Sequence, residues 1–164
     1  MNGVLMNLAQ ILRLRSGPQN LPASWPLMVV LLSAYLVQNL ITGQQLDDQN
    51  AAAKSLLAIC LQIVVLTGLL IWRKHPERFA QTMSALASVG IFFNAVTWAL
   101  LSLSDSTSNQ PILALIWFAV FIWSLFVDAH IYRNALSVPF AMGMLITVLT
   151  LAASYILIEM LFLT

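Results

Sequence analysis

Residues 111–133 read PILALIWFAVFIWSLFVDAHIYR, and this stretch decides the fold. From Pro111 onward, about seventeen residues are almost all apolar. At ~1.5 Å per residue, a helix of this length comes close to crossing the ~30 Å hydrocarbon layer of a bilayer. Other stretches of the chain have the same character. The sequence therefore predicts an all-α membrane protein rather than a water-soluble domain with a large core.

The composition leads to the same prediction. Of the 164 residues, 60% are hydrophobic and 8% are charged, and the mean hydropathy is +0.89. Ordinary soluble domains carry about 25% charged residues, so this chain lacks the side chains for a water-facing surface. The spans use nearly the whole chain, which leaves no separate catalytic or nucleic-acid-binding domain. A formal net charge of +1 gives no reason to expect a nucleic-acid partner.

We expect residues 1–164 to form a single membrane domain, a polytopic bundle of five transmembrane helices. Short loops between the spans predict that sequence neighbours pack antiparallel. The spans are expected at residues 26–42, 52–72, 79–103, 111–133 and 139–163.

Residues 1–16 predict an amphipathic helix lying in the membrane interface, because apolar side chains recur there at helical spacing and Arg13 and Arg15 follow them. A cleaved signal peptide is the alternative. The basic residues follow the apolar part instead of preceding it, which favours the interfacial helix. The prolines and the glycine of GPQNLPASWP, residues 17–26, then mark a turn back toward the bilayer.

The distribution of basic residues predicts the orientation. Basic residues in short loops resist translocation and so mark the cytoplasmic side. One side has Arg13, Arg15, Arg73, Lys74, Arg78 and Arg133, whereas the other has Lys54 beside Asp47, Asp48 and Asp105. We therefore expect a cytoplasmic N-terminus and a C-terminus on the opposite face.

Ionisable residues near the end of the fourth span form a candidate interfacial polar cluster. Asp128 is expected close to the cytoplasmic interface, with partners supplied from another segment, and the cluster comprises Asp128, His130, Arg133, Arg73, Lys74 and Arg78. Such a cluster could relay protons or bind a ligand. The favoured interpretation is a set of interfacial ion pairs that fixes the topology, since charges at span ends are ordinary features of membrane proteins.

Polar and small residues within the spans are candidates for helix contacts. Unpaired polar groups are costly in hydrocarbon, and small residues let helix backbones approach closely. The candidate contact residues are Gln62, Asn94, Ser84, Ser88, Gly90 and Gly143. The alternative is that the amides, together with Gln38, Asn39, Thr147 and Thr150, line a pathway. The structural interpretation is favoured because none of these side chains ionises.

The sequence contains no catalytic, metal or cofactor signature that we can identify. A G-x-S-x-G elbow, an H-E-x-x-H zinc motif and a P-loop are all missing from it. Cys60 is the single cysteine, which excludes an intrachain disulfide and a cysteine-based metal site. We therefore expect no enzyme activity, no cofactor and no bound metal.

The layout resembles the bacterial members of the Yip1 family of membrane proteins. The resemblance rests on RFAQTMSALASVG at residues 78–90, with Phe79, Gln81, Thr82 and Gly90 opening the third span after a basic loop. The chain departs from that family in lacking a long soluble N-terminal region. The resemblance implies a five-span protein of the bacterial inner (plasma) membrane, with its C-terminus in the periplasm, that acts through helix–helix contacts.

These observations predict a non-enzymatic membrane adaptor or assembly component. The partners expected are the lipid bilayer and either another membrane protein or further copies of the chain, contacted through the small-residue faces and the aromatic fourth span. A small oligomeric transporter or channel subunit is the alternative. A lipid-modifying enzyme is a third possibility, which would require a polar cavity around Asp128 and His130.

Overall fold

The computed structural model describes residues 2–46, 49–104 and 110–162. Within these ranges the regular elements are all helical: α1 Asn2–Leu12, the 3₁₀ helix η1 Pro18–Asn20, α2 Trp25–Gln45, α3 Ala51–Trp72, the 3₁₀ helix η2 Pro76–Arg78, α4 Phe79–Ser102, α5 Pro111–Leu136 and α6 Phe140–Phe162. Asp47, Asp48, Asp105 and the last residue of the predicted fifth span lie outside the described residues.

Five of these helices, α2 to α6, are long and apolar enough to cross a membrane, which confirms the predicted all-α fold with five candidate spans. Their ends lie within a few residues of the predicted spans. Local signals explain the ends: the Leu27 amide donates to Ser24 Oγ over 3.3 Å at the start of α2, where Pro26 occupies the first turn. A helix, α1, also forms within the predicted N-terminal segment.

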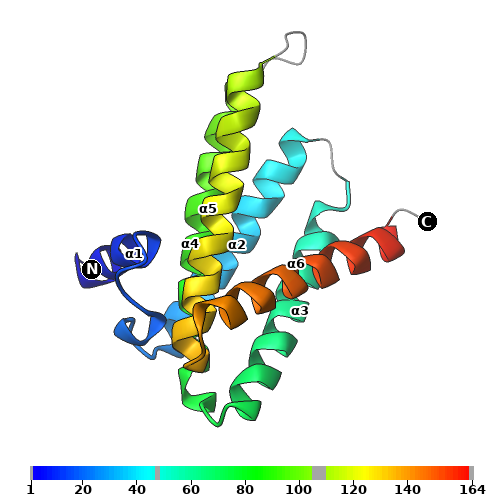
Figure 1. Cartoon of the computed structure of the whole chain (residues 1–164). Coiled ribbons are helices and arrows are strands. Elements are labelled where there is room, and N and C mark those ends of the chain that lie inside the picture. The colour runs from blue at the N-terminus through cyan, green and yellow to red at the C-terminus, as the bar shows by residue number, and fades with distance from the viewer. Residues whose placement is uncertain (1, 47–48, 105–109, 163–164) are drawn as a thin grey trace.

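Helix α4 is the central element of the bundle, since a far larger share of its length is buried than of any other candidate span in the described chain. It packs against α2 and α5, while α1 contacts the outer side of the α4–α5 pair. Helices α3 and α6 contact each other on the other side (Figure 1). Helix α6 leaves the end of α5 at a wide angle instead of running back along it (Figure 1).

The packed core lies toward one end of the bundle, where η2 and the Ser137–Pro139 turn are found. On α3, α5 and α6 the buried side chains occur only in the half next to this end, which we call the closed end. The opposite end, where α2 ends and α3 begins, is the open end. Figure 1 shows the helices converging at the closed end and spreading toward the open end. The buried residues nearest the closed end include Leu66, Leu70, Met83, Val127, Ile131, Tyr132 and Leu136.

Two glycines allow the close helix contacts of this core. A Cβ atom at Gly143 of α6 would collide with the carbonyl oxygen of Ala129 and lie 3.1 Å from the backbone nitrogen of Arg133, both on α5. A Cβ atom at Gly90 of α4 would lie 2.8 Å from the ring of Tyr35 on α2. Both glycines therefore face a neighbouring helix, as small residues in close helix contacts do.

We expect Gly143→Ala to destabilise the fold, because the added methyl group meets backbone atoms of α5 that have little freedom to move. The free energy of unfolding in mixed micelles should fall by ~1–3 kcal/mol, the usual cost of overpacking. Gly68→Ala is the matched control: Gly68 is also helical, but a Cβ atom there meets no atom within 4 Å. Equal effects of the two substitutions would contradict this account of the α5–α6 contact.

Candidate functional site

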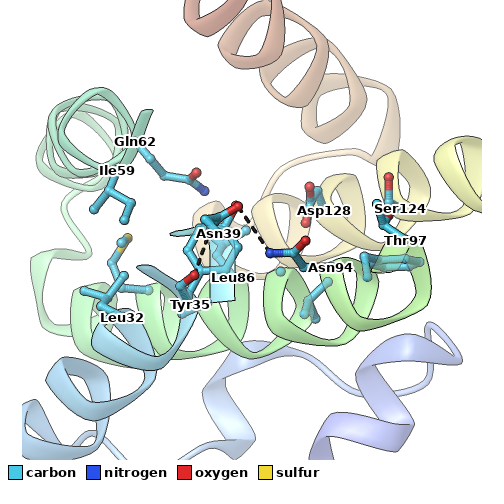
Figure 2. Close-up of a pocket in the computed structure, with 15 residues that line it drawn as sticks. Leu32, Tyr35, Asn39, Ile59, Gln62, Leu86, Asn94, Thr97, Ser124 and Asp128 are labelled. Atoms are coloured by element: carbon cyan, nitrogen blue, oxygen red, sulfur yellow. Dashed lines mark hydrogen bonds between the residues drawn. The ribbon is translucent and has the colours of Figure 1, made fainter. Parts of the chain in front are cut away.

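A cavity of about 290 Å³ lies between α2, α3, α4 and α5 and contains a group of polar side chains. Figure 2 shows side chains from all four helices directed into the same space. We call this cavity the polar chamber. Its polar lining residues are Tyr35, Asn39, Gln62, Asn94, Thr97, Ser124 and Asp128.

A second cavity of about 390 Å³ lies between α3, α5 and α6, and we call it the α6 chamber. The two chambers share Tyr35, Gln62, Ser124 and Asp128, so they meet along these four side chains. A third cavity of about 170 Å³ shares Tyr35 and Asn39 with the polar chamber and extends to Lys54 and Ser55 in the first turns of α3. The connected space therefore reaches from Asp128 toward the open end.

Amide side chains tie α2 to α4 across the polar chamber. Asn94 Nδ2 donates to Asn39 Oδ1 over 3.2 Å, and Thr42 Oγ1 lies within 3.3 Å of Asn94 Oδ1 as a donor. Asn39 Nδ2 in turn donates to the carbonyl oxygen of Tyr35 over 2.9 Å. Figure 2 shows the Asn39–Asn94 bond and the Gln62 amide extending toward it from α3. These contacts satisfy polar groups that would otherwise be costly in a membrane.

Asp128 differs from these neighbours because its carboxylate has no hydrogen bond or ion pair to any residue in the described parts of the chain. Its side chain is partly buried and lines both chambers. Ser124 and Tyr132 lie one turn before and one turn after it on the same face of α5. The Tyr132 hydroxyl is itself buried and faces Gln62 and Thr150 in the α6 chamber. This face of α5 thus presents one carboxylate and two hydroxyl side chains to the cavities.

The predicted polar cluster is divided in the structure. Arg73 Nε donates to the Leu136 carbonyl over 3.1 Å, and Arg78 Nη1 donates to the Ala135 carbonyl over 3.1 Å and to Ser137 Oγ over 3.0 Å. The expected pairing of the basic loop with Asp128 is therefore not formed. The physical reason is that the free carbonyls at the C-terminus of α5 are nearer acceptors for a cation, whereas Asp128 lies eight residues, or ~12 Å, farther along the helix.

The other members of the cluster also lie away from Asp128. His130 is buried on another face of α5, where its Nε2 is 3.1 Å from the Ser16 carbonyl oxygen of the segment that follows α1. Two residues along a helix correspond to a rotation of about 200°, which separates His130 from Asp128. Lys74 and Arg133 are exposed at the closed end. His130 therefore anchors the N-terminal segment and does not extend the Asp128 site.

The predicted helix-contact residues lie in two places. Four of them lie at helix contacts. Two are serines buried on α4, Ser84 and Ser88, and two are glycines that face a neighbouring helix, Gly90 and Gly143. Gln62 and Asn94 line the polar chamber instead, together with Asp128.

Sequence reasoning did not connect these amides with the carboxylate, and it missed Tyr35 and Ser124. A signal was present: Tyr35 and Asn39 on one helix, and Ser124, Asp128 and Tyr132 on another, recur at spacings of four residues.

Comparisons of the chain with protein-family models, with curated proteins and with solved structures gave no match. The resemblance to the Yip1 family stays a prediction. The geometry of the two chambers is therefore the feature from which a function can be inferred.

We expect the Asn39–Asn94 bond to contribute measurably to stability. In a double-mutant cycle of Asn39→Ala and Asn94→Ala, the coupling free energy should be ~0.5–1.5 kcal/mol, the range of interhelical hydrogen bonds in membranes. Pairing Asn39→Ala with Ser102→Ala is the matched control, because the Ser102 hydroxyl bonds to the Ala99 carbonyl of its own helix. Additive effects in the first cycle would show that the amide contact contributes nothing.

Proposed function

We propose that this chain is a small membrane transporter or channel subunit that binds a monovalent cation in the polar chamber, with Asp128 as the counter-charge. The observation that carries the proposal is an unpaired carboxylate in a chamber lined by neutral polar groups. The proposal assigns no enzymatic reaction to the chain.

The charge balance of the chamber supports a cation as the ligand. A charged side chain at the centre of a bilayer costs ~2.5–3.5 kcal/mol on insertion scales, and such residues usually have a partner or mark a path for ions or substrates. The polar lining of the chamber otherwise consists of hydroxyl and amide groups, which solvate a cation but do not neutralise a carboxylate. Lys54 lines the connected space at its open end, eight residues or ~12 Å before Gln62 on α3, so a single positive charge in the polar chamber is what neutralises Asp128 itself.

The shape of the bundle supports movement of the ligand along the membrane normal. The connected cavities extend toward the open end through Ser55 and Ala58 of α3. Toward the closed end, the fully buried side chains of Leu66, Tyr132 and Leu136 separate the chambers from the surface. A site that is closed toward one face of the membrane is the arrangement expected of one state of an alternating-access transporter.

We expect Asp128→Asn to abolish cation uptake. Propylammonium uptake into proteoliposomes under an inside-negative potential should fall roughly tenfold or more, the effect of losing a charge-assisted contact of ~1.5–3 kcal/mol. The substitution keeps the size of the side chain, so the bundle should still fold.

Glu77→Gln is the matched control, because it makes the same chemical change at an exposed residue of η2 outside both chambers. Uptake that is unaffected by Asp128→Asn, in a correctly folded and inserted protein, would overturn the proposal.

A membrane adaptor, the function that the sequence favours, is our second proposal, now restricted to one surface. The small-residue contacts are used within the chain, since Gly90 faces Tyr35 and Gly143 faces Ala129. The aromatic side chains of α5 remain outward, with Phe118 63% exposed and Phe126 42% exposed. That surface could contact lipid, another membrane protein or a further copy of the chain.

If the adaptor proposal holds, the protein purified from native membranes in mild detergent should carry a stoichiometric membrane partner or a second copy. The double variant Phe118→Ala/Phe126→Ala should lose this partner, because it removes much of the exposed aromatic area. Leu145→Ala/Leu149→Ala on α6 is the control. A partner retained equally by both variants would exclude the α5 surface.

We also propose that α1 lies in the cytoplasmic interface of a bacterial inner membrane, with the C-terminus in the periplasm. Ile11 of α1 is fully buried against the bundle, whereas Leu5 and Met6 are 65% and 63% exposed. The indole nitrogen of Trp123 donates to the Leu12 carbonyl over 3.1 Å, which holds α1 beside α5. An exposed apolar face followed by Arg13 and Arg15 suits contact with anionic lipid.

A further inference from the structure

We infer that the cation bound at Asp128 is amphiphilic: an ammonium group in the polar chamber and an apolar arm in the α6 chamber. This inference rests on the proposed function and names the substrate class for the same site. The observation behind it is that two chambers meet at the unpaired carboxylate of Asp128, and that α5 and α6 add large apolar side chains to the lining of one of them.

The junction of the chambers fits a primary or secondary ammonium group. Asp128, Ser124 and Gln62 line both chambers, so a cation held there can contact a carboxylate, a hydroxyl and an amide. Each of these side chains offers an oxygen that can accept an N–H hydrogen bond. The Tyr35 ring borders the same junction and adds an aromatic face, a further favourable contact for an organic cation.

The α6 chamber fits the apolar arm. Leu151, Tyr155 and Ile158 of α6 recur at spacings of three to four residues and line one side of it, while Phe121 and Leu125 of α5 line the other. The hydroxyl side chains of Thr147, Thr150 and Ser154 complete the α6 side, so the apolar surface there is continuous only along the first three residues. Its volume of about 390 Å³ lies within the ~300–1,000 Å³ range of small-molecule sites. A small inorganic cation would leave this chamber unused, whereas an alkyl chain fills it and removes apolar surface from water.

The divergence of α6 supplies a route for such a ligand. Helix α6 contacts α5 closely near Gly143 and points away from it farther along, as Figure 1 shows. Leu151 and Tyr155, 45% and 66% exposed, therefore face both the chamber and the outside of the bundle. In a bilayer this outside is lipid, in which amphiphilic amines concentrate.

The test compares alkylammonium ions of different length on the full chain in nanodiscs of neutral phosphatidylcholine. Binding of decylammonium and propylammonium is measured by calorimetry at known free aqueous concentrations, with Asp128→Asn nanodiscs as the reference for partitioning into lipid. We expect Asp128-dependent binding of both ions, with decylammonium at least roughly tenfold tighter because of its buried methylene groups. Decyl sulfate should show no Asp128-dependent binding.

A second variant tests the position of the arm. Ser154→Leu fills space in the α6 chamber, which Ser154 lines, and should reduce decylammonium affinity to near that of propylammonium while leaving propylammonium binding unchanged. Ala152→Leu, at an exposed position of α6 outside both chambers, should change neither affinity.

The outcomes distinguish the amphiphilic ligand inferred here from the cation site proposed at Asp128. Equal Asp128-dependent affinities for the two ions, or an unchanged preference in Ser154→Leu, would overturn the amphiphilic arm and leave the cation site standing. No Asp128-dependent binding of either ion would overturn both.

Discussion

The backbone contact between α5 and α6 at Gly143 is the constraint on which the shape of this bundle depends. Because a glycine sits where α6 meets α5, the two helices approach closely over the first turns after the Ser137–Pro139 connection. The core follows the same pattern, since the buried residues of α3, α5 and α6 lie in the half of each helix nearest this contact. The opposite halves of these helices separate, and the separation leaves room for the two chambers.

In this arrangement, desolvation of the polar side chains that line the chambers costs free energy. The amides of Asn39 and Asn94 bond to each other, so their desolvation is offset within the chain. Asp128 has no such compensation from the described residues, and Ser124 and Gln62 offer it only neutral groups. An uncompensated carboxylate favours any ligand that neutralises it, and this preference connects the fold to the proposed function.

The helices could be predicted from the sequence because each span is an apolar run bounded by polar loops, and because Ser24 and Pro26 mark a helix start. The contacts at Gly90 and Gly143 could also be predicted, since small residues mark close approaches of helices. The cavity was not. Gln62 and Asp128 lie on helices that are not neighbours in the chain, and the packing of α3 beside α5 brings them to one chamber. Their loop lengths allow several such packings.

The contacts of the basic loop, residues 73–78, also could not be predicted from the sequence. Counting charges predicts where Arg73 and Arg78 lie along the membrane normal but not which atoms they contact. The structure directs both side chains to carbonyl oxygens at the end of α5, because a helix C-terminus attracts cations. These bonds join the α3–α4 loop to the α5–α6 turn, so the two connections form one unit at the closed end.

Gly143 lies three residues after the start of α6, so most of the helix extends beyond its contact with α5. About nineteen residues, or ~28 Å, extend beyond the contact. A rotation of ~10° about Gly143 therefore moves the far end of α6 by ~5 Å while the contact itself scarcely shifts. The width of the α6 chamber depends on that angle, so a change in the thickness of the surrounding bilayer that tilts α6 also changes the chamber.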